Sequence, residues 1–232
     1  MKKAFTLILA LCILAGFSAP ASAAPFHRNA VYEYYSAEGF YVDSIGNTWS
    51  YSYHVPQIFA YSPAADEINA EIAERFAKPV EHQFEVMLGR HSLSMWNTEW
   101  HAYWNGTQLF LLVSSTIDSD ITDCCAYGYD FETEKRITNE MILDQLGISE
   151  EEYLENLEEK VRLMFEDTFR SVPAEKLEDY GYSDLLSKTL SWLDMEQPMY
   201  IDGTGEIVTI VKIASAAGAG WYYHYATPFA YG

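Results

Sequence analysis

The clearest pattern in the chain is a strict alternation of large apolar and small polar side chains near residue 50. Ser50, Ser52 and His54 separate apolar residues that occupy every second position. A period of two is typical of a strand with one buried face. We predict a strand that ends at Pro56 and buries Trp49, Tyr51, Tyr53 and Val55. Residues 24–46 lack this regularity and are interpreted as a loosely patterned N-terminal leading segment.

Helical periodicity begins near Pro63. Proline is tolerated in the first turn of a helix, so we predict that a helix starts there. Pro79 is expected to kink or end this helix, and a second helical piece is predicted over residues 80–88. Ser149, with a glutamate three residues later, forms a capping box that predicts the longest helix of the chain. A shorter helix is predicted over residues 139–146, closed by a glycine. The positions expected to be buried on the two longer helices are Ala65, Ile68, Ile72, Phe76, Leu154, Leu157, Val161, Met164, Phe165 and Thr168.

Asn105-Gly106 is a strong signal for a hairpin between two strands, residues 93–104 and 107–115. Three further strand signals and a terminal aromatic run complete the pattern, at residues 126–131, 199–202, 206–214 and 221–225. Runs of strands followed by runs of helices favour an α+β fold. We predict antiparallel sheets with helices packed on one face, a two-layer sandwich.

The N-terminus has the composition of a secretory signal peptide. Lys2 and Lys3 precede an apolar run that is followed by Ala21-Ser22-Ala23, an A-x-A cleavage site. We therefore predict a signal peptide over residues 1–23, which includes Cys12, and an extracytoplasmic or secreted protein of the cell envelope. No later apolar segment predicts a membrane span. The remainder is interpreted as one domain, residues 47–232, or as two intimate halves, residues 47–115 and 116–232.

The chain is strongly acidic. It has a formal net charge of −20, which becomes −22 once Lys2 and Lys3 are removed. Such a surface repels nucleic acid and anionic membranes. A cationic protein, a divalent cation or a neutral polymer such as cell-wall glycan remains a suitable partner. The acidity could also serve solubility alone.

Three tryptophans, Trp96, Trp100 and Trp104, are four residues apart and share one face of a strand. Neighbouring members would lie about 13 Å apart. That spacing suits a platform on which sugars stack, but the same residues could instead fill the core. Trp221, Tyr222 and Tyr223 near the C-terminus raise the same two possibilities. All six are candidate ligand-binding residues.

Cys124 and Cys125 are adjacent in the chain. Their Cα atoms must be about 3.8 Å apart, closer than the usual range for a disulfide. Three states remain open: two separate packed thiols, a strained vicinal disulfide with a redox or conformational role, and intermolecular pairing. Exported compartments permit the second and third.

The acidic loop with Asp118, Asp120 and Asp123 does not match a calcium-binding EF-hand, because Asp123 and Tyr129 stand where glycine and glutamate are required. The histidines lack the H-E-x-x-H spacing of a zinc site. We expect neither a bound metal nor a cofactor.

Signatures of catalysis are weak. No G-x-S-x-G motif indicates a serine hydrolase. Glu99 with His101, or Asp130, could act as general acid or base, which would make the chain a cell-wall polymer hydrolase or deacetylase. The alternative is that they are ordinary surface residues, and no catalytic residue is assigned.

Several short segments resemble an exported domain of Gram-positive bacteria. They are Val55-Pro56-Gln57-Ile58, the turn block 129–138, Ile201-Asp202-Gly203-Thr204-Gly205-Glu206 and residues 211–218. This domain of unknown function is shared by the extracellular part of the lysozyme-sensing anti-sigma factor (RsiV type) and the N-terminal part of a peptidoglycan deacetylase (PdaC type). The resemblance implies an α+β fold. It also implies a non-catalytic binding or sensing role at the cell envelope, with a lysozyme-like basic protein or peptidoglycan as ligand.

Overall fold

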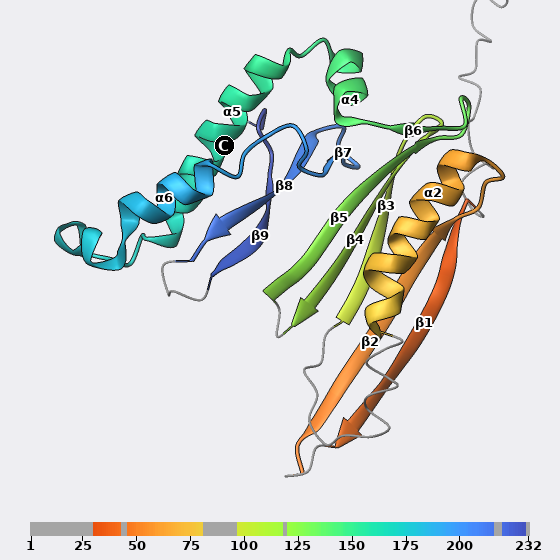
Figure 1. The fold of residues 1–232 in the computed structure, drawn as a ribbon, viewed down its shortest axis with the longest axis horizontal. Helices are drawn as coiled ribbons and strands as arrows, with labels where there is room; N and C mark the ends of the chain where they lie inside the picture. The colour runs from red at the N-terminus through yellow and green to blue at the C-terminus, as the bar shows by residue number, and fades with distance from the viewer. Residues whose placement is uncertain (1–29, 43–45, 81–96, 118–119, 216–219, 231–232) are drawn as a thin grey trace, which may run out of the picture. The chain divides into compact units, whose positions relative to one another are not determined.

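The computed structural model describes residues 30–42, 46–80, 97–117, 120–215 and 220–230. Residues 31–232 form one compact unit. Within the described ranges there are two sheets, one of six strands and one of three, together with helices, so the predicted α+β class is confirmed (Figure 1). No helix in the described ranges is both long and apolar enough to cross a membrane. The predicted signal peptide lies outside these ranges.

The six-stranded sheet follows the chain order from one edge to the other. Its strands are β1 (Val31–Val42), β2 (Thr48–Ile58), β3 (Asn97–Asn105), β4 (Gln108–Ile117), β5 (Asp120–Asp130) and β6 (Lys135–Ile137). Neighbours are antiparallel except β2 and β3, which are parallel and paired only at Tyr53 and Thr98. The hairpin predicted at Asn105-Gly106 joins β3 to β4, and Gly106 adopts the positive φ that this turn requires.

The leading segment contains a strand that its sequence pattern did not predict. β1 pairs with β2 over almost its full length, so residues 31–42 belong to the large sheet. β2 also continues past Pro56 to Ile58, contrary to prediction. Proline has no N–H to donate to a neighbouring strand. Pro56 lies opposite Glu33 beside a register shift, and beyond the single residue pair that joins β2 to β3, so its missing N–H interrupts no run of hydrogen bonds between strands. The predicted boundary between the two halves, at residues 115 and 116, falls within β4, and β4 pairs with β5. The two predicted halves therefore share one sheet.

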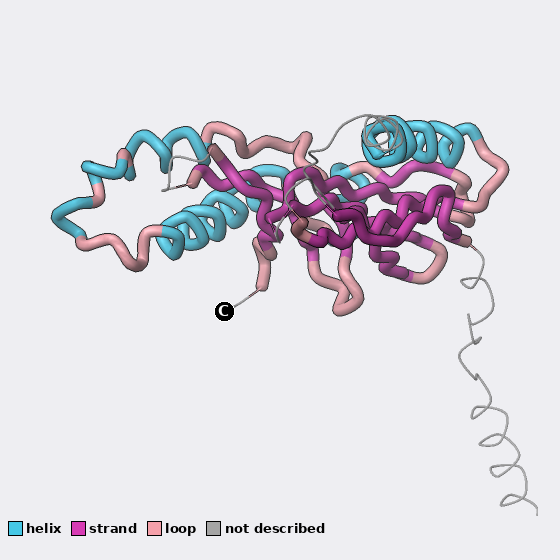
Figure 2. The backbone as a smooth tube through the Cα atoms, turned by 90° about the horizontal axis from the view of Figure 1, so that it is seen from below, coloured by secondary structure: helices cyan, strands magenta, loops and turns pink. Residues whose placement is uncertain are grey.

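α2 (Pro63–Ile72) covers one face of the large sheet (Figures 1 and 2). Ser62 caps it, and a π-turn, η2 (Ala73–Ala77), continues it. Residues 78–80 remain helical, so Pro79 does not end the helix, which was one of its two predicted effects. A proline ring clashes with the carbonyl four residues earlier, here that of Arg75, and the wider π-turn relieves such crowding. The helix predicted beyond Val80 lies outside the described residues.

The three-stranded sheet orders β7 (Met199–Ile201), β8 (Ile207–Ala214) and β9 (Trp221–Ala226), close to the predicted strands. Three helices accompany it: α4 (Asn139–Leu146), α5 (Glu150–Thr168) and α6 (Tyr182–Leu190). The predicted caps are present, with Ser149 accepting from the Glu152 amide and Gly147 left-handed after α4. Tyr153 replaces the predicted Thr168 on the buried side of α5, where its hydroxyl bonds to Thr209 of β8.

Two apolar clusters lie on opposite faces of the large sheet, and β4 shows the division. Leu109, Leu111 and Val113 pack with α2, whereas Phe110 and Leu112 pack with α5 and the small sheet. Each sheet therefore has helices on one face.

Candidate functional site

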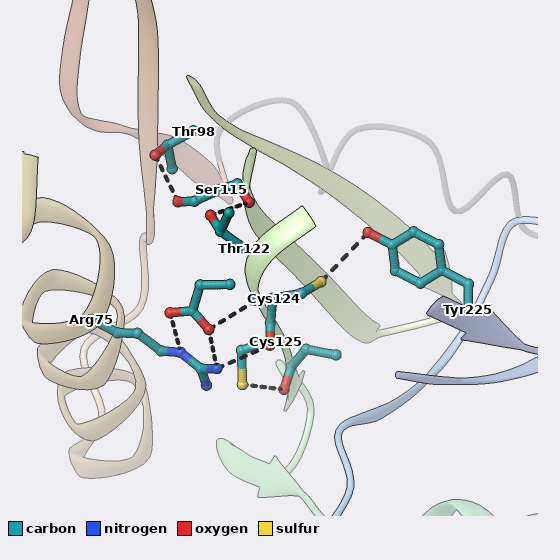
Figure 3. A network of polar contacts seen from close by, with 9 residues as sticks. Arg75, Thr98, Ser115, Thr122, Cys124, Cys125 and Tyr225 are labelled. Atoms are coloured by element: carbon teal, nitrogen blue, oxygen red, sulfur yellow. Dashed lines mark hydrogen bonds and ion pairs between the residues drawn. The ribbon is translucent and has the colours of Figure 1, made fainter. Parts of the chain in front are cut away.

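One edge of the large sheet is closed. β6 covers only the last three residues of β5, Gly128, Tyr129 and Asp130. Beside the remainder of β5, Arg75 of η2 donates to Asp123 from Nε (2.9 Å) and Nη2 (2.5 Å) and to the Cys124 carbonyl (3.1 Å) (Figure 3). Asp123 in turn accepts from the Cys124 amide (2.9 Å). The ion pair thus occupies the backbone groups that an incoming strand would use.

A second ion pair reinforces this closed edge. Arg136 of β6 donates to both carboxylate oxygens of Glu71 in α2, at 2.5 and 2.8 Å. Glu71 and Arg75 are four residues apart, so one helix face fastens both β5 and β6. The Asp123 carboxylate therefore has a structural role, as the partner of Arg75 and of the Cys124 amide. Of the other acidic-loop residues, Asp120 is exposed and Asp118 lies outside the described ranges.

The cysteine pair lies at the same edge, with its two side chains on opposite faces of β5 (Figure 3). Both thiols are free, and Cys124 lies 3.5 Å from the Tyr225 hydroxyl. Burial raises the pKa of Cys124 to about 12 and also raises the pKa of Cys125. Both are thus neutral thiols at ordinary pH, which makes them weak nucleophiles. This is the separate-thiol state. A redox role stays a prediction.

Two adjoining clefts open beside Cys125, of about 390 and 410 Å³. Both are bounded by the segment that connects α6 to β7, and both include Glu196, Gln197 and Pro198. The larger one also contains Arg75 and Lys212. Sequence reasoning missed Lys212, although a lysine within the apolar run Ile207–Ala214 is a visible anomaly.

The C-terminal aromatic residues belong to β9. Trp221 and Tyr223 meet edge to face, with ring centroids 4.9 Å apart, and both rings lie beside the Lys212 ammonium. Tyr222 is half-buried and points to the opposite face of the strand, as alternation requires. Of these three residues, Tyr223 lines the larger cleft, whereas Trp221 contacts only the Lys212 side chain that lines it.

The predicted tryptophan platform is only partly described, because Trp96 lies outside the described residues. Trp100 and Trp104 are half-buried on β3 and pack against the α2 cluster, and Trp104 stacks on Phe131 at 5.7 Å. The packing explains their spacing as core contacts. Ligand binding by these residues stays a prediction.

The carboxylates considered for acid–base chemistry are far apart. Glu99 pairs with Ser114 and Asp130 with Gln108, positions roughly 20 Å apart along β4. Glu99 and His101 are exposed. Asp130 is buried, and its carboxylate accepts hydrogen bonds from the Thr107 and Thr133 hydroxyls and the Glu132 amide. Desolvation by itself would raise the pKa of Asp130, but these hydrogen bonds outweigh it and lower the pKa. Asp130 therefore holds together the turn after β3 and the turn after β5. Neither Glu99 nor Asp130 lines the clefts beside Cys125.

The opposite edge of the large sheet is open. β1 has β2 on one side, and no strand of the described residues pairs with its other side. Exposed rings gather here: Tyr32 contacts Phe59 and Phe59 contacts Tyr61, with centroids 6.1 and 5.5 Å apart. Tyr61 is 91% exposed and Phe40, further along β1, is 72% exposed. We call the exposed side chains of β1, with Phe59 and Tyr61, the β1 edge surface.

The sequence segment that contains this surface carries acids and no Lys or Arg of its own. Between Arg28 and Arg75 the charged residues are Glu33, Glu38, Asp43, Asp66, Glu67, Glu71 and Glu74. His54 of β2 is held between two of them, with Nδ1 2.8 Å from Glu33 and Nε2 2.8 Å from Glu38. Burial opposes its charge, but both carboxylates favour it and raise the His54 pKa. The sequence signal for this site was the long stretch without cations.

Comparison with known proteins adds little. No protein-family model matches the chain, and no curated protein does. A search of the solved structures finds a DUF3298 family protein from Pseudomonas aeruginosa PAO1, with 13% sequence identity and a TM-score of 0.43. The match covers 85% of this chain and 88% of that one. That neighbour belongs to a domain family of unknown function, and a likeness of this size carries no conclusion about a site.

Proposed function

We propose that this chain is an exported, non-catalytic binding domain of the cell envelope, and that its β1 edge surface binds a cationic protein. The observation that carries the proposal is the open edge itself. A strand of 12 residues has a free side and exposed aromatic rings. Natural sheets usually block such edges with lysine, proline or a covering element, because an open edge pairs with other chains.

Charge selects the class of partner. The surface is bordered by carboxylates, and the whole chain is strongly acidic, so a second copy or another acidic protein would be repelled. A basic protein would be attracted and steered toward it. Exposed aromatic side chains supply the apolar contact area that dominates many interfaces. The resemblance of the turn block 129–138 to the lysozyme-sensing domain makes a lysozyme-like protein the first partner to test.

The test is a titration of the exported chain with a basic lysozyme at low and high salt. We expect saturable binding that weakens with salt. The triple variant Tyr32→Ala, Phe59→Ala, Tyr61→Ala should weaken it about tenfold or more, since aromatic anchors carry most binding energy. A matched control replaces Leu163 and Tyr180, exposed apolar residues elsewhere, and should leave binding unchanged.

Two outcomes would overturn the proposal. In the first, the triple variant and the control bind equally well, which places the contact elsewhere. In the second, the exported chain ignores the basic protein and binds peptidoglycan without salt dependence. Loss of that binding on Trp100→Ala would support the tryptophan platform instead.

A further inference from the structure

Lys212 is placed where lysine is costly. It lies within β8, whose other seven residues are all buried, and its own side chain is half-buried. The ammonium lies 4.4 Å from the Trp221 ring centroid and 5.5 Å from that of Tyr223. No ion pair among the described residues includes it. The ammonium is thus half-buried against two aromatic rings, and among the described residues it has no carboxylate partner.

A second cation faces the same cleft. Arg75 uses Nε and Nη2 on Asp123 and the Cys124 carbonyl, while its third nitrogen, Nη1, points away from Asp123 (Figure 3). Lys212 and Arg75 both line the 410 Å³ cleft. Lys212, together with the remaining Nη1 donor of Arg75, whose charge is already paired with Asp123, offers donors for a carboxylate.

The outer part of the same cleft carries the opposite charge. Asp194 and Glu196, both exposed, belong to the connection between α6 and β7 and line the cleft with the two cations. A purely anionic ligand would be repelled by these carboxylates, and a purely cationic one by Lys212 and Arg75. A ligand with one group of each sign satisfies both sets. Trp192, Pro198 and Ile210 supply apolar lining between them.

The acidic wall is fixed before any ligand arrives. Asn139 donates from Nδ2 to the carbonyls of Met195 (2.6 Å) and Gln197 (2.7 Å). Gln197 donates from Nε2 to the Trp192 carbonyl at 2.5 Å. A wall tied at three points loses little entropy on binding, which favours affinity for a small ligand. The volume lies within the range of small-molecule sites.

We infer that this cleft binds a small zwitterion, an α-amino acid or the end of a short peptide, with its carboxylate at Lys212 and Arg75 and its ammonium at Asp194 and Glu196. This site is separate from the β1 edge surface and does not depend on its function. An amino acid and a peptide both present a free α-carboxylate and an amine. The set of ligands tested distinguishes the two sources.

The test is calorimetric titration of the exported chain with matched ligands: apolar amino acids, their dipeptides, their N-acetyl derivatives and their amides. We expect saturable binding of the zwitterion and about tenfold weaker binding of both the N-acetyl and the amide forms. Tighter binding of the dipeptide would identify peptide ends as the source. Because these comparisons use the unaltered chain, they do not depend on whether a variant folds.

Variants assign the groups. Lys212→Met should weaken zwitterion binding about tenfold, whereas Lys176→Met, an exposed lysine away from the cleft, should not change it. Glu196→Gln should weaken binding of the amino acid but strengthen that of its N-acetyl derivative. No saturable binding to the unaltered chain, equal binding of the zwitterion and its amide, or unchanged binding by Lys212→Met would each overturn the inference.

Discussion

At one edge of the large sheet, β5 is covered by a short partner strand, by Arg75 with Asp123, and by Arg136 with Glu71. At the other edge, no strand of the described ranges pairs with the outer side of β1, which carries exposed rings, and its own sequence segment has no Lys or Arg. Both edges belong to one sheet and face the same risk of unwanted pairing. Two bidentate ion pairs lie at one edge, and among the described residues none lies at the other. The proposal that β1 is a binding edge rests on this difference.

The largest expected effect comes from loosening the closed edge at its turn. Asp130→Ala leaves the donors of Thr107, Thr133 and the Glu132 amide without their acceptor. We expect a loss of about 2–3 kcal/mol in unfolding free energy, measured by urea denaturation. Glu155→Ala, an exposed carboxylate, is the control and should change it by less than about 0.5 kcal/mol. Equal effects would remove the structural role assigned to Asp130.

Asp130 also makes stability depend on pH. Its pKa is lowered in the folded state, so its stabilising contribution is fully present above the unfolded pKa, about 3.9, and is lost as pH falls through the folded pKa. The stability of Asp130→Ala should therefore fall less steeply below about pH 4 than that of the unaltered chain. Parallel curves would contradict this.

The second prediction opens the closed edge directly. Arg75→Ala leaves the Asp123 carboxylate and the Cys124 carbonyl without their donor. Since the pair is about one-third exposed, we expect a loss of roughly 1–2 kcal/mol, less than for a fully buried pair. Lys78→Ala, which breaks an exposed helix pair with Glu74, should cost about 0.5 kcal/mol or less. Denaturation of both variants tests the ranking.

The third prediction closes the open edge. Phe40→Lys places a cation at an exposed position of β1 and should change the unfolding free energy by no more than about 0.5 kcal/mol. It should nevertheless weaken binding of the cationic partner, because lysine blocks edge pairing and repels that partner. Tyr180→Lys makes the same charge change on another surface and should leave binding intact. Equal loss in both variants would indicate a nonspecific charge effect.

The smallest effect concerns His54. Glu33 and Glu38 raise its folded pKa, so its stabilising contribution is present below the unfolded pKa, about 6.5, and is lost as pH rises through the folded value. Chemical-shift titration of the His54 ring should give a pKa above 6.5, and one that falls in Glu33→Gln. A His54 pKa at or below 6.5 would contradict the geometry.

Several elements could be predicted because their signals are local. The capping serine before α5, the glycine after α4 and the Asn105-Gly106 turn act through neighbouring backbone groups, so the sequence alone places them. β1 was missed because an edge strand with exposed rings lacks clean alternation. Its identity rests on pairing with β2, a contact between distant residues.

The candidate sites show the same division. From sequence, Trp100 and Trp104 were candidates both for a platform and for the core, and their packing against the α2 cluster explains them as core contacts. Lys212 has no neighbours in the sequence that suggest a site. Arg75, Asp194 and Trp221 reach it only through the packing of η2, the α6–β7 connection and β9.

By itself the sequence determined the α+β class, most strands and helices, the acidic character and the expectation of export, because these depend on composition, periodicity and local capping. Only the tertiary structure decided which edge of the sheet is closed and which is open. It also decided that Cys124 and Cys125 face different clusters, and that Lys212 shares a cleft with Asp194 and Glu196. The physical reason is that these features depend on contacts between residues far apart in the chain, which no local pattern encodes.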